Sequence, residues 1–194
     1  MDSYKSNSLF RPGSNTNLNA CVGYNGGPYS YFEYALGYFE AASAILDGIK
    51  TRTVRVDLGV YPMVFSFRHA VELALKHFVS ALPKLFDESQ ELVLSHKLEP
   101  NWLLVRPYIR REEGFSPSET VPIIDQILKD LEYFDPRGEV FRFPEARSGE
   151  MHLGDAAIIN VEIVGDAVKE CERVMDFWND RLEEFLQLRL EGWA

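Results

Sequence analysis

The C-terminal part of the chain carries the pattern that most narrows the choice of fold. Apolar residues recur in alternating steps of three and four, at Val161, Val164, Val168, Cys171, Met175, Trp178, Leu182 and Phe185. This spacing places an apolar seam along one face of an α-helix, as in a coiled coil. It predicts a long amphipathic helix over about residues 158–190, which either closes a bundle or pairs with a second copy of the chain.

Earlier segments also have helical periodicity. Helices are predicted over residues 30–49, over residues 60–82 with Pro62 in the first turn and an end at Pro83, and over a short stretch interrupted at Pro107. A further helix is predicted from about Thr120 to residue 134, after a capping box formed by Ser116 and Glu119. The chain is therefore predicted to be all-α, an antiparallel bundle of four to five helices with a long C-terminal helix.

The N-terminal segment differs in composition from the rest. Residues 1–29 are rich in Gly, Asn, Ser and Pro, and they are predicted to form an irregular arm. Residues 30–194 hold enough apolar side chains for one core, and they are predicted to form a single helical domain. Residues 139–150 are rich in Pro, Gly and charge, and they are predicted to cross the bundle without regular structure.

Composition excludes several classes of protein. The sequence contains no apolar run of the length that spans a bilayer, and its N-terminus lacks the apolar region of a secretory signal. Cys21 and Cys171 lie far apart, without the spacing of a disulfide framework or a zinc site. We expect a cytoplasmic, reduced protein without membrane association.

The net charge of −10 argues against broad affinity for nucleic acids, which depends on cations that meet phosphates. The charge is uneven, because residues 1–111 hold 12 Lys and Arg against 10 Asp and Glu, whereas residues 112–194 hold 8 against 20. Two small basic clusters, at residues 50–55 and 106–111, are read either as solvated surface or as sites for a small anion or a short stretch of RNA.

The predicted second helix carries four polar residues in apolar surroundings. Arg68, His69, Glu72 and Lys76 are spaced to form one stripe, and phenylalanines and aliphatic residues flank it. The stripe is either a row of exposed ion pairs or a partly buried lining of a cleft. Buried ions without partners are costly, so the second reading makes the stripe a candidate functional site.

A metal site at this stripe would lie beside two positive charges. His69 and Glu72 have the spacing of a helical ligand pair, but Arg68 and Lys76 would repel a cation. We therefore predict no metal and no cofactor.

Two later residues join the candidate site. His96 lies in the segment SHKLEPNW, at a turn before a helix, and is read either as a surface residue or as a second acid/base. Arg142 stands between two phenylalanines, so its stem should be buried. Its guanidinium is expected to meet Glu72, another carboxylate or a bound anion.

The segments FRHAVELALKHF, SHKLEPNW and FRFPEARSGE, followed by a long helix, resemble bacterial proteins related to the HEPN superfamily. The resemblance covers about residues 60–190. It implies an antiparallel helical bundle that often dimerises. Many such proteins are metal-independent ribonucleases of toxin–antitoxin, abortive-infection or other defence systems, whereas others are binding modules without catalysis.

The superfamily's signature is an Arg separated by four to six residues from a His at the start of the last helix. Arg147 and His152 have this separation, but Gly149 lies between them and the regular apolar spacing of the last helix starts later. Arg147 and His152 therefore stand as an alternative pair to Arg68 and His69.

The leading hypothesis is a HEPN-like protein of a bacterial defence or toxin system that binds or cleaves RNA or a nucleotide. In it Arg68 and His69 are the central catalytic residues, with His96 as a second acid/base. Glu72 orients His69 or Arg68, whereas Lys76 and Arg142 contact phosphate. Two alternatives remain. One is a non-catalytic module that forms a homodimer or binds a partner protein from a defence or toxin–antitoxin system. The other is a bundle whose stripe is a structural ion-pair network.

Overall fold

The computed structural model describes residues 7–27, 29–88, 94–111, 115–154 and 158–191. The chain divides into two compact units, Met1–Ser30 and Tyr31–Ala194. Residues 1–6 and 28 of the predicted arm lie outside the described residues. The described part of the first unit is irregular except for the short 3-10 helix η2 (Thr16–Leu18), which begins at an Asn15 side chain that accepts a hydrogen bond from Asn17 N.

The described part of the second unit contains five α-helices and no strand, which confirms the predicted all-α bundle. They are α1 (Tyr31–Lys50), α2 (Val56–Leu85), α3 (Leu98–Arg111), α4 (Thr120–Phe134) and α5 (Val161–Leu190). None of the helices in the described ranges has the length and apolarity needed to span a membrane.

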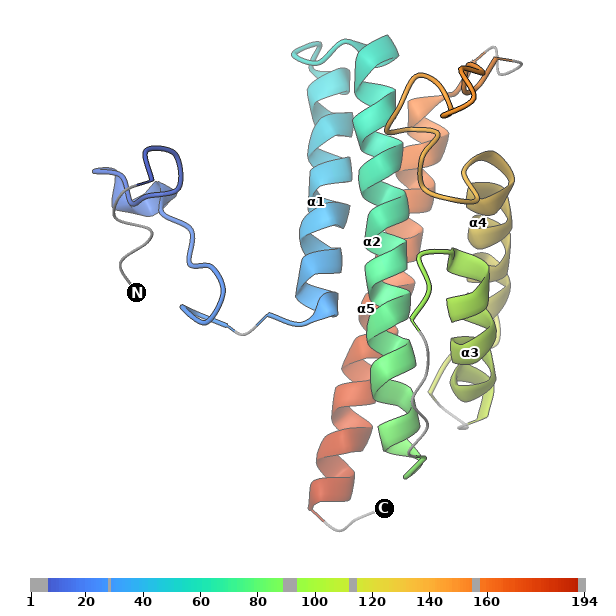
Figure 1. Ribbon diagram of the computed structural model, residues 1–194. Coiled ribbons are helices and arrows are strands. Elements are labelled where there is room, and N and C mark those ends of the chain that lie inside the picture. The colour runs from blue at the N-terminus through green and yellow to red at the C-terminus, as the bar shows by residue number, and fades with distance from the viewer. Residues whose placement is uncertain (1–6, 28, 89–93, 112–114, 155–157, 192–194) are drawn as a thin grey trace. The chain divides into compact units, whose positions relative to one another are not determined.

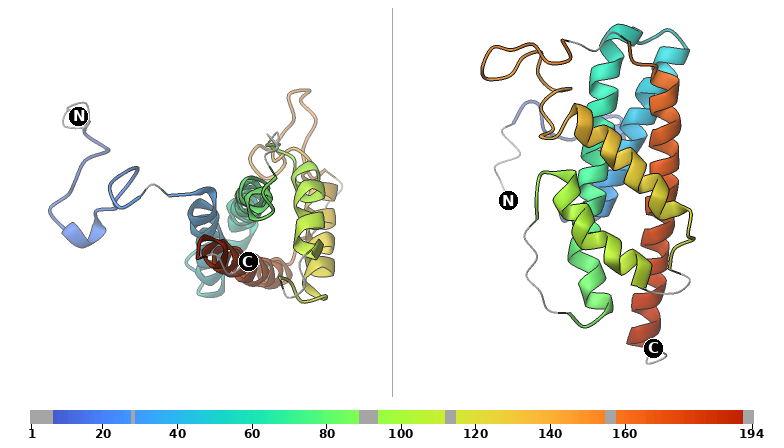
Figure 2. Two further views of the ribbon diagram at one scale, coloured as in Figure 1. Left: turned by 90° about the horizontal axis from the view of Figure 1, so that it is seen from below. Right: turned by 90° about the vertical axis from the view of Figure 1, so that its right-hand side faces the viewer.

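The three long helices α1, α2 and α5 pack against one another (Figure 1). Helices α1 and α2 form an antiparallel hairpin, and α5 runs antiparallel to α1. The shorter helices α3 and α4 lie side by side across α2 and α5 (Figure 2). Helix α2 is thus surrounded, and every residue from Ala70 to Lys76 is buried.

The predicted seam of α5 forms part of this core. Val161, Val168, Cys171, Met175, Trp178 and Leu182 are buried, while Val164 and Phe185 are partly buried against the same core. The Trp178 ring stacks on Trp102 of α3 at a centroid distance of 5.9 Å and meets Phe78 of α2 edge-on at 6.1 Å. The seam therefore closes the bundle within one chain.

Several predicted helix boundaries were wrong at proline residues. Helix α2 starts earlier than predicted and continues through Pro83 to Leu85, and α3 continues through Pro107. A proline removes one backbone hydrogen bond from a helix interior. Pro107 and Pro62 lie on exposed faces, where water can replace that bond.

The capping box predicted before α4 is also wrong. Glu119 is the N-cap residue, and its side chain forms no capping hydrogen bond. The hydroxyl of Ser116 instead accepts a hydrogen bond from Trp178 Nε1 at 3.0 Å and pairs with the hydroxyl of Thr120. Ser116 thus ties α4 to α5 rather than capping α4.

Candidate functional site

Three of the predicted polar residues form a chain of ion pairs along α2. Arg68 Nη1 donates to Glu72 Oε2 at 3.1 Å, and Lys76 Nζ donates to Glu72 Oε1 at 2.8 Å. All three residues are buried, and Arg68 is only 3% exposed. The four-residue spacing puts them on one side of the helix, and the packing around α2 covers that side.

Arg68 also binds two loops that cross α2. Its Nε donates to the carbonyl oxygen of Asp135 at 2.9 Å, and its Nη2 donates to the carbonyl oxygen of His96 at 3.3 Å. Each of the three guanidinium nitrogens therefore has a partner within the protein. Arg68 joins the segment before α3 and the turn after α4 to the central helix.

The turn after α4 is shaped to receive Arg68. Asp135 Oδ1 accepts hydrogen bonds from the backbone nitrogens of Glu139 at 2.7 Å and Val140 at 3.1 Å, which closes the turn. A Cβ atom at Gly138, whose φ is +73°, would lie 2.6 Å from Arg68 Nη1. An Asp followed three residues later by a Gly is a common turn signal, but nothing in the local sequence indicates that this turn receives Arg68.

Asp135 is also a second carboxylate at the ion-pair chain. It is buried, and its Oδ2 lies 3.8 Å from Arg68 Nε without a hydrogen bond in the described part of the chain. Arg68 therefore lies between two buried carboxylates, Glu72 and Asp135. The sequence did not single out Asp135, because its partner is 67 residues away along the chain.

His96 lies at the open end of the network. Its Nδ1 is 3.0 Å from Glu72 Oε1 and 3.4 Å from Lys76 Nζ, while its side chain is 88% exposed. The neighbouring backbone is fixed by buried Asn101, whose amide exchanges two hydrogen bonds with the backbone of Ser95. A buried carboxylate thus holds an exposed imidazole on a fixed loop, an arrangement that suits acid–base chemistry.

Glu72 is ionised in this setting. Burial by itself would raise the pKa of Glu72, but hydrogen bonds from Lys76 and His96, together with the charges of Lys76 and Arg68, lower this pKa below its usual value. Glu72 therefore serves as the anion of the network.

His69 and Arg142 belong to a different group of side chains. The His69 ring meets Tyr38 edge-on at 4.5 Å and stacks on Phe65 at 5.8 Å. The Arg142 guanidinium lies 5.5 Å from the centroid of Phe65 and 5.2 Å from that of Phe143. Arg142 does not pair with Glu72, which was one of its predicted partners. Its guanidinium lies over the rings of Phe65 and Phe143 instead.

The surroundings of His69 favour its neutral form. Burial lowers the pKa of His69, and the charges of Lys76, Arg68 and Arg142 lower this pKa further against the opposing effect of Glu72. His69 and Glu72 also have separate partners, so they do not form a ligand pair. In the described ranges no three His, Cys, Asp or Glu side chains come together as a metal site.

Arg147 and His152 lie in the connection before α5, not on the helix itself. Hydrogen bonds Gly149 N to Ala146 O at 2.9 Å and Ala146 N to Glu150 O at 2.8 Å form a tight turn, with Arg147 exposed near its tip. His152 follows this turn and is half-buried. The two residues therefore do not share a helix face.

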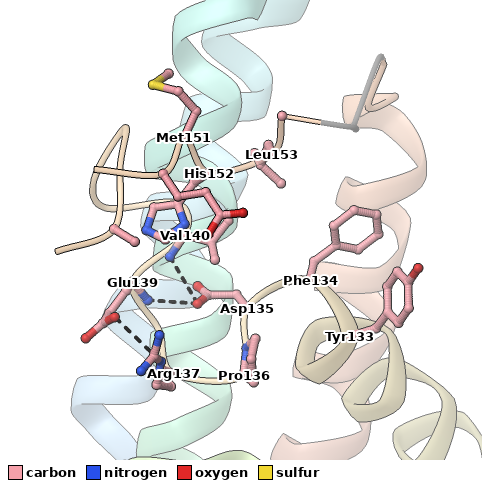
Figure 3. A pocket seen from close by; sticks show the side chains of 13 residues that line it. Tyr133, Phe134, Asp135, Pro136, Arg137, Glu139, Val140, Met151, His152 and Leu153 are labelled. Carbon is pink, nitrogen blue, oxygen red and sulfur yellow. Dashed lines mark hydrogen bonds and ion pairs between the residues drawn. The ribbon is translucent and has the colours of Figure 1, made fainter. Parts of the chain in front are cut away.

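His152 lines a pocket of about 540 Å³ between the end of α4, the turn at 135–140 and the turn at 146–150 (Figure 3). Three carboxylates, from Asp135, Glu139 and Glu150, and one guanidinium, from Arg137, contribute to its walls. This excess of negative charge disfavours a phosphate ligand in the pocket. We place the candidate site at His96 instead.

Searches of protein-family models, curated proteins and solved structures found no match to this chain.

Proposed function

We propose that the protein is a HEPN-like protein that binds RNA or a nucleotide and acts on it through His96. The observation that carries the proposal is the contact between the exposed imidazole and a buried carboxylate. Glu72 Oε1 lies 3.0 Å from His96 Nδ1, while His96 Nε2 has no hydrogen bond in the described part of the chain. With the Nδ1 proton directed at Glu72, Nε2 faces solvent as a base.

The reaction would be a metal-independent cleavage of RNA. His96 Nε2 would take the proton of a ribose 2′-hydroxyl, whose oxygen attacks the adjacent phosphorus. The products are a 2′,3′-cyclic phosphate and a 5′-hydroxyl end: water donates a proton to the leaving oxygen, and the hydroxide that remains takes the proton from the His96 imidazolium. The charge on Glu72 would stabilise the imidazolium that forms.

Arg68 takes a positioning role in this proposal. It is buried, and each of its three guanidinium nitrogens already donates to an acceptor within the protein, so a phosphate in solvent does not reach it. It holds the carbonyl of His96 and the carboxylate of Glu72, and thereby fixes the distance between them. Lys76 contributes in the same way, through Glu72.

The competing function is a non-catalytic interaction module, in which the ion pairs only stabilise the bundle. The burial of Arg68, with all three guanidinium nitrogens bonded within the protein, favours this alternative. Both hypotheses share three expectations from the family resemblance. These are homodimerisation, a partner protein, and a role in defence or toxin–antitoxin systems.

The two functions are separated by pairing an activity assay with a thermal melt. Single-stranded RNA oligonucleotides are incubated with the protein in EDTA, and the ends of the products are analysed. We expect His96→Ala to reduce cleavage by about 100-fold or more while the melting temperature stays unchanged. We expect Arg68→Ala to lose about 3–5 kcal/mol of stability, because it leaves Glu72 and Asp135 as buried charges with fewer partners.

His152→Ala is the matched control, since it removes a histidine of the alternative pair. Cleavage that survives His96→Ala but not His152→Ala would transfer the role to the alternative pair. If the wild-type protein neither cleaves nor binds RNA or nucleotides, the interaction module is the better reading.

A further inference from the structure

Five side chains from three segments form a continuous aromatic ladder on the second unit. In order along the ladder they are Tyr38 of α1, His69 and Phe65 of α2, and Arg142 and Phe143 of the connection before α5. Successive ring contacts measure 4.5 Å and 5.8 Å, and the guanidinium of Arg142 lies over both Phe65 and Phe143. The ladder is separate from the ion pairs around Glu72.

The outer end of the ladder is open to solvent. Phe143 is 51% exposed, and Arg142 is exposed as well. The guanidinium has no ion pair and no hydrogen bond in the described residues, so its donors remain available. An exposed phenyl ring beside an exposed, unpaired guanidinium contributes little to packing.

We propose that the aromatic ladder is a nucleobase-stacking subsite, with a base on the free face of Phe143 and the adjoining phosphate on Arg142. The inference rests on the proposed function and names where that ligand is held. A planar guanidinium can bind a phosphate through two parallel N–H donors. Aromatic rings accept any base, because each base presents a π-face.

The charge of the protein makes stacking the main source of affinity. A chain with a net charge of −10 repels a polyphosphate backbone at long range. Short-range contacts must therefore hold the ligand, and one stacked base combined with one charge-assisted phosphate contact supplies them. The subsite should accordingly prefer purines, which offer a larger stacking area than pyrimidines.

Fluorescence anisotropy with short 2′-O-methyl oligonucleotides tests the subsite, since these probes cannot be cleaved. We expect oligo(A) to bind more tightly than oligo(U), and Phe143→Ala and Arg142→Ala each to weaken binding by about tenfold. Phe143→Leu should behave like Phe143→Ala, because it keeps an apolar side chain but loses the ring. An oligomer without bases should bind the wild-type protein weakly, and it should bind the Phe143→Ala variant with the same affinity.

Phe134→Ala and Arg147→Ala are matched controls, because they remove another exposed phenyl ring and another exposed guanidinium outside the ladder. Both should bind as wild type does. Equal affinity of wild type and Phe143→Leu, or the absence of any oligonucleotide binding, overturns the inference. If binding depends on the ladder but cleavage does not depend on His96, the subsite stands and the catalytic proposal is rejected. If cleavage depends on His96 but binding does not depend on the ladder, the catalytic proposal stands and the subsite is rejected.

Discussion

At the residue scale, the main feature is a row of buried charges on α2. Arg68, Glu72 and Lys76 have lost most of their hydration, and removal of one member of such a group leaves an uncompensated buried charge. The main role of these three residues is therefore to hold neighbouring segments in place. They hold the segment that carries His96 and the turn that carries Asp135 against the same helix.

Gly138 is the residue at which this arrangement is most easily broken. Gly138→Ala would place a Cβ atom against the Arg68 guanidinium and would force an alanine to a positive φ. We expect a loss of stability of about 2–3 kcal/mol in urea unfolding, with a smaller loss for the backbone strain alone.

The variant Gly149→Ala measures the cost of the backbone strain alone. Gly149 also has a positive φ, of +83°, but a Cβ atom there would meet nothing within 4 Å. The difference between the two variants measures the displacement of Arg68. If both variants lose the same free energy of unfolding, the Arg68 side chain moves aside without an energetic penalty. That result would contradict a fixed network.

At the element scale, α5 provides the seam that closes the bundle. The predicted heptad-like spacing is real, but its apolar side chains pack against α1, α2 and α3 of the same chain. A homodimer therefore needs another surface. Homodimerisation stays a prediction of the family resemblance.

Trp178 is the central side chain of this seam. Its exposed fraction is 0%, and it contacts Trp102, Phe78 and Ser116. We expect Trp178→Asp to abolish cooperative thermal unfolding, because loss of a buried tryptophan costs about 3–5 kcal/mol before the buried charge is counted.

The adjacent residue offers a control for this substitution. Phe177 is 37% exposed on a neighbouring face of α5, so Phe177→Asp should retain a cooperative melt. A Trp178→Asp protein that melts at the wild-type temperature would show that the seam does not hold the bundle together.

At the scale of the whole molecule, stability should depend on pH through two histidines. Burial lowers the pKa of His77, as it lowers the pKa of His69, below the usual value of 6.5. The unfolded chain therefore binds more protons than the folded chain below that pH. The contribution of both residues is fully present above pH 6.5 and is lost as the pH falls toward their folded pKa values.

We expect the free energy of unfolding in urea to decrease from about pH 7.5 to about pH 5.5, and His77→Phe to reduce this decrease. The rings of Phe32 and Phe78 lie 5.3 Å and 5.4 Å from the His77 ring, so a phenyl group fits the surroundings. Burial raises the pKa of Glu172 and Asp176, so these carboxyl groups change the stability with pH in the opposite direction. Both groups are present in the wild type and in His77→Phe, so the comparison of the two proteins removes their effect. An identical pH dependence in wild type and variant would contradict the assignment.

The sequence predicted the elements well because their signals are local. The three- and four-residue spacing of apolar side chains indicates a helix wherever it occurs, and α1, α4 and α5 end close to the predicted residues. The ends of α2 and the continuity of α3 were mispredicted. A proline removes one hydrogen bond, but packing along the whole helix can outweigh that loss.

The local pattern of residues is sufficient to predict a helical bundle with polar residues on one side of α2. How those polar residues divide into two groups depends on long-range packing. Arg68, Glu72 and Lys76 meet His96, whereas His69, one residue from Arg68, joins Arg142 among aromatic rings. Consecutive residues on a helix point about 100° apart, so they meet different neighbours, and those neighbours come from loops whose paths depend on long-range contacts rather than on local periodicity.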